Sequence, residues 1–103
     1  MAIRVLIERK MRPANRKEVL ALLRALRRGC LEQPGYISGE TLFANDDPNT
    51  LVVLSTWFGL MDWRRWHGST ERNELEAELR TYLESPETIR ILLEGITEEH
   101  SGA

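Results

Sequence analysis

The sequence has a single cysteine, no long apolar run and no strong excess of either charge. With one cysteine, Cys30, no disulfide can form within the chain, which fits a reducing cytoplasm. No apolar stretch approaches the roughly 20 residues that span a bilayer, and the N-terminus lacks the apolar core of a signal peptide. The net charge of −2 argues against general nucleic-acid binding. We therefore expect a cytoplasmic protein that binds neither membranes nor nucleic acid.

The signatures of metal and cofactor sites are also missing from the sequence. No cluster of His, Cys, Asp and Glu has the spacing of metal ligands. No Gly-rich loop could hold a phosphate, and there is no nucleophile elbow. We therefore expect neither a metal nor a cofactor. This expectation is compatible with cofactor-free oxygenation, and equally with no redox chemistry at all.

The 103 residues have the length of one domain, 1–103. Apolar residues alternate along 3–10, which is typical of a strand, and the apolar period then becomes helical. Asn15 and Glu18 have the spacing of a capping box, and Ser69 could cap a later helix. The sequence predicts strands at 3–10, 36–44, 50–57 and 88–96, a helix from Asn15 to Gln33, a short helix at 59–68 and a helix from Ser69 to about Leu83.

The order of these segments is β-α-β-β-α-β, with two adjacent helical pieces in the second helical position. This order predicts an α+β, ferredoxin-like fold with a four-stranded antiparallel sheet, in which the first and third strands are central and the helices cover one face. We expect an ordered core over about 3–96 and a flexible tail at 97–103.

Three strands, including the two central ones, carry apolar residues on both faces, most clearly at 5–7, 51–54 and 91–93. One layer of helices covers only one of those faces, so the other face needs a different cover. A second copy of the same sheet would supply it. The sequence therefore predicts a homodimer that packs through the sheet face into a barrel-like core.

The segments IRVLIERKMRP, LEQPGYISGETL and NDDPNTLVVLSTW, the last followed by an aromatic-rich helix ending in WHGS, resemble the antibiotic biosynthesis monooxygenase family over about residues 3–96. The resemblance implies a dimeric α/β barrel with a ligand cleft between the sheet and the helices of each subunit. It also implies several activities, since the family includes cofactor-independent oxygenases of phenols and quinols, haem-degrading enzymes, an isomerase and members of unknown role.

The resemblance to the haem-degrading branch is incomplete. Trp57 and Trp66 reproduce the spacing of two tryptophans in that branch. The position of its iron-ligating histidine is occupied by Glu76, and an asparagine expected on the first strand corresponds to Glu8. These departures argue against a haem-degrading role.

Three tryptophans lie within ten residues, and we take Trp57, Trp63 and Trp66, together with Glu40 on a neighbouring strand, as candidate substrate-binding residues. On a helix, Trp63 and Trp66 lie on neighbouring parts of one face. The alternative is that the rings only pack in the core, where burial of large side chains is favourable.

Glu8 and His67 are the candidate catalytic residues. A histidine can act as an acid or a base near neutral pH, although His67 could equally be a surface residue at a helix end. Glu8 could take a phenolic proton if it projects into the cleft, where desolvation would raise its pKa, or it could pair with Arg4. The leading hypothesis is a cofactor-independent monooxygenase for a small planar phenolic or quinol-type compound. The alternatives are an isomerase or a non-catalytic module that binds small aromatic molecules, and thirdly haem binding, which Glu76 disfavours.

Overall fold

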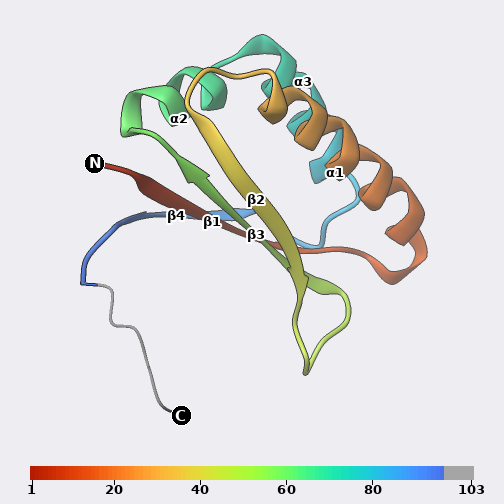
Figure 1. Cartoon of the computed structure of the whole chain (residues 1–103). Helices are drawn as coiled ribbons and strands as arrows, with labels where there is room; N and C mark the ends of the chain where they lie inside the picture. Colours follow the sequence, from red (N-terminus) through yellow and green to blue (C-terminus); the bar gives the residue numbers. More distant parts are fainter. Residues whose placement is uncertain (97–103) are drawn as a thin grey trace.

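The computed structural model of the chain describes residues 1–96, and within this range it contains four strands and three α-helices (Figure 1). The elements are β1 (Ile3–Lys10), a 3-10 turn (Pro13–Asn15), α1 (Arg16–Leu31), β2 (Tyr36–Phe43), β3 (Thr50–Trp57), α2 (Leu60–His67), α3 (Thr70–Arg80) and β4 (Thr88–Leu93). The predicted tail at 97–103 lies outside the described residues.

The sheet has the strand order β2-β3-β1-β4, and every neighbouring pair is antiparallel. The helices all lie on one face of it (Figure 1). Strands β1 and β3 are central, as the sequence predicted, and the α+β ferredoxin-like fold is confirmed. None of the described helices is both long and apolar enough to cross a membrane.

The alternation of β1 divides its side chains between the two faces. Ile3, Val5 and Ile7 are buried beneath the helices, while Leu6 and Glu8 are half-buried on the opposite face. Their cross-strand partners on β3 follow the same division, since Ile7 pairs with Val53 and Leu6 pairs with Leu54. The core therefore lies between the inner face of the sheet and the helices.

The outer face of the sheet is left without a helical layer. Leu6, Val52 and Leu54 are half-buried there, and Leu42 and Leu92 are exposed. We refer to these five residues as the open face. Their arrangement agrees with the sequence pattern, in which the central strands are apolar on both sides.

The helix ends differ from the sequence predictions at Asn15, at the end of α1, which is Leu31 instead of Gln33, and at the end of α3. The Asn15 side chain makes no capping hydrogen bond, because Pro13–Asn15 form a 3-10 turn that leads directly into α1. Helix α3 ends at Arg80 instead of Leu83, because Leu83 forms a β-bridge with Met11 at the end of β1. By contrast, Ser69 caps α3 as predicted, since its Oγ accepts a hydrogen bond from the Arg72 backbone N–H at 3.2 Å.

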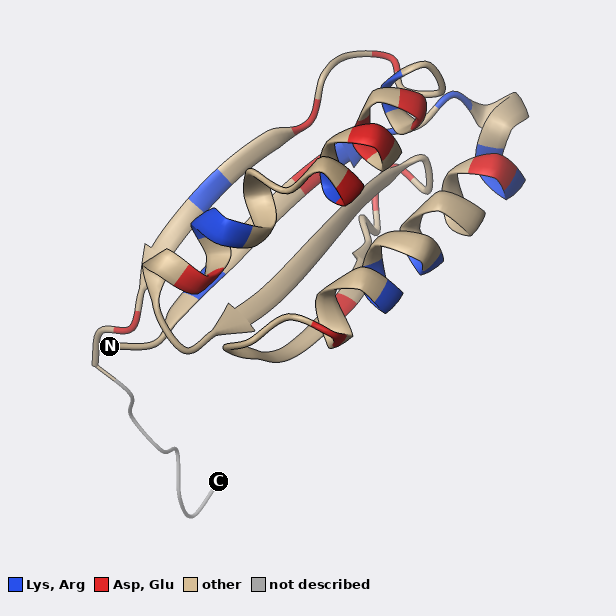
Figure 2. Ribbon diagram, turned by 90° about the horizontal axis from the view of Figure 1, so that it is seen from above, with Lys and Arg blue, Asp and Glu red and all other residues tan. Residues whose placement is uncertain are grey.

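Helices α1 and α3 lie side by side across the sheet, with α2 at one end (Figure 1). Helix α1 carries mainly basic residues and α3 mainly acidic ones on the surface turned away from the sheet (Figure 2). At Gly29 of α1 a Cβ atom would lie 2.4 Å from Cη2 of Trp66. The absence of a side chain at Gly29 therefore lets α1 approach the indole ring of α2.

Candidate functional site

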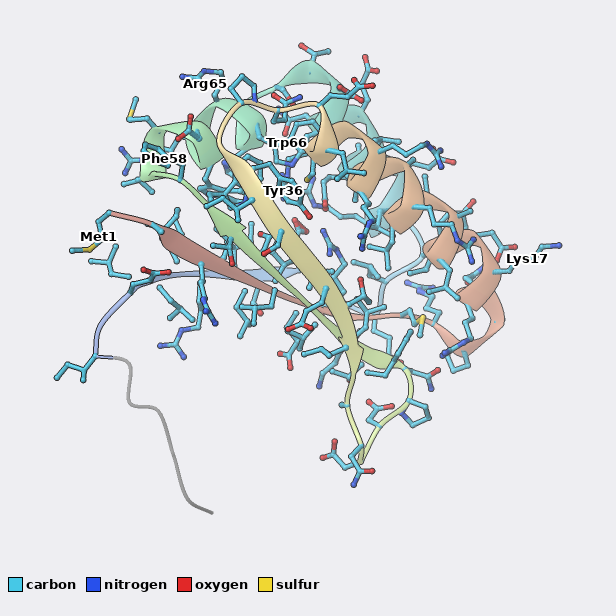
Figure 3. All side chains as sticks on the ribbon, viewed as in Figure 1. Met1, Lys17, Tyr36, Phe58, Arg65 and Trp66 are labelled. Carbon is cyan, nitrogen blue, oxygen red and sulfur yellow. The ribbon has the colours of Figure 1, made fainter. Side chains whose placement is uncertain are left out.

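A cleft lies between the inner face of the sheet and the helices. The cavity itself has a volume of about 70 Å³, and the cleft as a whole, counted together with the open solvent at its mouth, has about 560 Å³ free of protein atoms. The sheet contributes Ile7, Arg9, Tyr36, Gly39, Glu40, Thr41, Val53 and Ser55, and the helices contribute Leu23, Leu26, Arg27, Cys30, Trp63, Trp66, Arg72 and Glu76. Figure 3 labels Tyr36 and Trp66, which come from the start of β2 and from α2.

Two of the predicted substrate-binding tryptophans line this cleft. Trp63 and Trp66 are 3% and 2% exposed, so both rings belong to the core and also form part of the cleft wall. Trp57 lies outside the lining and is completely buried. Its ring meets Tyr36 edge-on at a centroid distance of 5.2 Å and Trp63 at 5.7 Å, and its Nε1 donates to Ser55 Oγ at 3.0 Å. Trp57 thus supports the residues that line the cleft.

The side chains of the two candidate carboxylates on the strands, Glu8 and Glu40, do not point into the cleft. Glu8 pairs with Val52 and lies on the face that the helices leave uncovered, so it does not meet the condition under which it would act as a base in the cleft. Glu40 borders the cleft at the edge strand, but its register opposite Leu54 directs its side chain to the outer face. There it borders a shallow hollow together with Arg4 and Thr56.

His67 is exposed and stacks on Trp63, with ring centroids 5.3 Å apart and planes inclined by 30°. It is not among the residues that line the cleft, and it contacts the cleft wall only through the ring of Trp63. Partial burial, followed by the charge of Arg72, lowers the pKa of His67 below its ordinary value of 6.5. This shift favours the neutral imidazole.

The most unusual feature of the cleft is a buried cluster of three charged side chains, Arg9, Arg72 and Glu76, which we call the Arg–Glu–Arg cluster. Their exposed fractions are 2%, 2% and 0%. Arg9 Nη2 donates to Glu76 Oε1, and Arg72 Nη2 lies 3.6 Å from the same oxygen. The Arg72 guanidinium also lies over the Trp63 ring, 5.3 Å from its centroid. Burial lowers the pKa of Arg72, and the neighbouring Glu76 opposes that shift.

The hydrogen bonds of this cluster are incomplete. Four buried side-chain atoms in the described part of the chain have no hydrogen-bond partner, namely Arg9 Nε and Nη1, Arg72 Nη2 and Glu76 Oε2, and all belong to the cluster. Such groups are costly to bury without a partner. The cluster was not among the sequence predictions, although one signal for it was present. The alternation that turns Ile3, Val5 and Ile7 inward also turns Arg9 inward.

Two other polar side chains of the cleft hold their protons at neutral pH. Burial raises the pKa of the Cys30 thiol from 9.0 to about 11. Burial also raises the pKa of the Tyr36 hydroxyl above 10.0. A Cβ atom at Gly39 would lie 2.5 Å from Tyr36 Oη, so Gly39 leaves room for this hydroxyl. Both groups can therefore donate a hydrogen bond to a ligand, but neither can act as a base at neutral pH.

The described residues do not assemble a set of metal ligands. Within 1–96, no group of three or more His, Cys, Asp and Glu side chains lies close enough to hold a metal ion. Glu76, at the position of the iron-ligating histidine in the haem-degrading branch, has one carboxylate oxygen engaged by Arg9.

The model of the antibiotic biosynthesis monooxygenase family matches residues 2–78. This chain belongs to that family. The matched range covers the sheet strands β1 to β3, α1, α2 and most of α3, and so includes every residue that lines the cleft. The family resemblance stated from the sequence segments is confirmed. No curated protein matches this chain at a significant level.

Several solved structures share the fold of this family member. A conserved protein from Methanosarcina mazei Go1 is 23% identical, with a TM-score of 0.83 over 88% of this chain and 90% of that one. Rv0793 from Mycobacterium tuberculosis is 19% identical, with a TM-score of 0.85 over 96% and 100%. SnoaB, a cofactor-independent oxygenase from Streptomyces nogalater, is 16% identical, with a TM-score of 0.82 over 93% and 95%. At these identities the likeness establishes the fold and not the activity.

Proposed function

We propose that the protein is a cofactor-independent monooxygenase that acts on a small planar phenolic or quinol-type compound. The observation that carries the proposal is the cleft, in which Trp63 and Trp66 form an aromatic wall above an apolar sheet surface. Membership of the antibiotic biosynthesis monooxygenase family supports the reaction type. The fold shared with SnoaB, a cofactor-independent oxygenase, supports it further.

The composition of the cleft suits a flat organic molecule. Ile7, Val53, Leu23 and Leu26 supply apolar surface on both sides of the space, and the indole rings of α2 close one end. Aromatic pairs contribute about 0.5–1.5 kcal/mol beyond the burial of their area. A planar ring that packs against these walls would therefore be oriented as well as bound.

The chemistry of the proposal needs little from the protein beyond this environment. A deprotonated, electron-rich substrate gives its own electrons to O₂, and a new C–O bond forms. For an anthrone-type CH₂ group, one oxygen atom ends in the carbonyl and the other leaves as water. The cleft would hold the reacting carbon in place and exclude bulk water from the intermediates.

One observation favours a second candidate, a module that binds small aromatic compounds without oxidising them, or an isomerase. Neither Glu8 nor His67, the predicted bases, is among the residues that line the cleft. Under this alternative the aromatic wall has the same role in binding, but no oxygen is consumed.

Oxygen uptake separates the two candidates. The purified protein is mixed with a panel of anthrones and quinols in an oxygen-electrode cell, and each rate is corrected for spontaneous oxidation without protein. Saturable uptake with at least one compound is expected. A ligand-dependent rise in melting temperature without oxygen consumption would favour the binding module. No uptake and no melting shift across a diverse panel would contradict both candidates.

A variant that fills the cleft ties the activity to this site. Thr41 lies on the edge strand β2 and lines the cleft, so Thr41→Trp would place a large ring in the substrate space. Oxygen uptake should fall at least about tenfold, since the ring denies the substrate its packing surface. Ala21→Trp, at an exposed position of α1 outside the cleft, is the matched control and should leave uptake unchanged.

We further propose that the protein is a homodimer joined through the open face. Leu6, Val52 and Leu54 form an apolar centre there, flanked by Leu42 and Leu92. Charged residues share this face with the apolar residues, namely Arg4, Glu8, Glu40 and Arg90. An apolar centre with a polar rim is typical of an interaction site. A second copy of the sheet offers the same apolar surface in return, as a symmetric interface requires.

A further inference from the structure

The charges of the Arg–Glu–Arg cluster do not balance. Two guanidinium groups share one carboxylate, so the buried cluster carries an excess of one positive charge. Exposed Arg27 lines the cleft as well, but the charge of Glu71 opposes it there. Glu87, whose charge also acts on Arg72, is paired with Arg80, so the excess positive charge rests on the two arginines of the cluster. A buried charge without a counter-charge is strongly unfavourable. The cluster would therefore gain most from a ligand that brings one negative charge.

The unpartnered donors of the cluster belong to residues that line the cleft. Arg9 Nε and Nη1 and Arg72 Nη2 are buried and have no hydrogen-bond acceptor, and both residues line the cleft. The guanidinium group presents its N–H donors in a planar fork, whose geometry matches the two oxygens of a carboxylate. These donors lie beside the aromatic wall, because Arg72 packs on the Trp63 ring.

We propose that Arg9 and Arg72 form an anion subsite, and that the aromatic ligand of the cleft carries a carboxylate that binds there. The inference rests on the proposed function as far as the ligand is a small aromatic compound. A carboxylate is ionised at neutral pH, whereas a simple phenol is not. One bound carboxylate brings the cluster and its ligand to neutrality and supplies acceptors to donors that the fold leaves unpaired.

This subsite also explains why Glu76 is present. Without it, the positive charges of two buried guanidinium groups would have no carboxylate to compensate them in the cluster. Glu76 holds Arg9 through Oε1 and lies 3.6 Å from Arg72 Nη2, and it neutralises only one of the two charges. Glu76 is therefore a positioning residue in this proposal, and the arginines are the binding residues.

Binding of a matched pair of ligands tests the inference. The ionised acid 2-naphthoate and the neutral amide 2-naphthamide have the same ring system and nearly the same shape. Their dissociation constants are measured by isothermal titration calorimetry at pH 7 in 150 mM salt, where attraction to exposed charges is largely screened. We expect 2-naphthoate to bind at least about tenfold more tightly, as charge-assisted hydrogen bonds to buried donors should give.

Two variants should move this preference in opposite directions. Arg72→Met leaves one arginine and one glutamate, so the preference for the acid should disappear while the amide still binds. Glu76→Gln keeps the shape of the side chain but leaves both positive charges, so the acid should bind more tightly than to the unaltered protein. Arg24→Met, an exposed residue of α1 outside the cleft, is the matched control and should change neither constant.

Each outcome is decisive. Equal affinity for acid and amide would overturn the anion subsite and leave the aromatic cleft standing. An acid preference that Arg72→Met leaves intact would also overturn it, and if that variant does not fold, a Glu76→Gln protein with no gain in acid affinity would do the same. If neither ligand binds, both the subsite and the aromatic cleft are contradicted. If the protein consumes oxygen with neutral anthrones but binds 2-naphthoate and 2-naphthamide equally, the proposed activity stands and the anion subsite is overturned.

Discussion

At the scale of single residues, the site depends on close contacts made by small side chains. Gly29 of α1 faces the Trp66 ring, and a Cβ atom there would lie 2.4 Å from Cη2 and 3.1 Å from Cζ3. An indole ring held in the core cannot move away as a flexible chain end could. The absence of a side chain at Gly29 thus helps to fix the position of Trp66 in the cleft wall.

Gly29→Ala should therefore destabilise the fold, although alanine is the better helix former. The gain in helix propensity is about 1 kcal/mol at most, whereas overpacking in a core costs about 1–3 kcal/mol. We expect a net loss of roughly 1–2 kcal/mol in the free energy of unfolding, measured by urea denaturation. Gly95→Ala is the control, because a Cβ atom at Gly95 has nothing within 4 Å. Equal stability of the two variants would contradict the contact.

The sequence predicted some site residues and missed others for a physical reason. Trp63 and Trp66 were found because helical spacing places both on one face, and that face packs on the sheet. Glu8 was predicted to act as a base if it projects into the cleft, but the strand register places it on the outer face of the sheet. The Arg–Glu–Arg cluster was missed because it joins residues 67 positions apart, and no local pattern reports such a pairing.

At the scale of elements, three strands were predicted to within one residue, whereas β4 ends at Leu93 instead of residue 96, and the helix ends were predicted less well. The strand 50–57 was predicted with the bounds that the structure shows, because its β-branched run lies between the turn sequence NDDPN and Gly59. The capping box at Asn15 was wrong because a proline two residues earlier begins a 3-10 turn. The end of α3 was overestimated because the apolar spacing that continues to Leu83 belongs to a β-bridge with Met11.

The connection between α3 and β4 is secured by an ion pair. Arg80 Nε and Nη2 donate to the two carboxylate oxygens of Glu87, each at 2.8 Å. The hydrogen bond from Arg80 lowers the pKa of Glu87 from an ordinary 4.5 to about 2. Since the folded-state pKa lies below the unfolded-state value, the pair stabilises the fold fully above about pH 4.5 and loses this effect as the pH falls toward 2.

Glu87→Gln should accordingly lower the free energy of unfolding at pH 7 by about 1 kcal/mol, a value reduced because the arginine is partly exposed. The difference between the variant and the unaltered protein should shrink between pH 5 and pH 2, as measured by urea denaturation at several pH values. Glu84→Gln, at an exposed position nearby, serves as the control. A difference that stays constant down to pH 2 would show that the carboxylate does not stabilise the fold through its charge.

At the scale of the whole molecule, the oligomeric state depends on what covers the open face. The helices cover only the inner face of the sheet (Figure 1), and the outer face presents aliphatic residues of the central strands. A monomer would leave these residues in contact with water, at a cost of about 25 cal/mol for each Å² of apolar surface. The proposed homodimer removes that cost.

Sedimentation velocity at micromolar concentration should find a species of twice the chain mass of 11.9 kDa. Leu54→Glu, in the centre of the open face, should shift the protein to the monomer, because a carboxylate would have to be buried directly opposite the like charge of Glu40. Leu31→Glu, at a 60% exposed position of α1, should remain dimeric. A monomer in the unaltered protein would contradict the proposed interface.

The central claim is that the cleft beneath the helices binds a small aromatic compound. The most direct test is a titration of ¹⁵N-tryptophan-labelled protein with 2-naphthamide, followed through the indole N–H signals in NMR spectra and assigned with single Trp→Phe variants. We expect saturable shifts that are largest for Trp63 and Trp66, which line the cleft, and smaller for Trp57 behind them. A ligand that binds without moving the Trp63 and Trp66 signals, or one that does not bind, would contradict the claim.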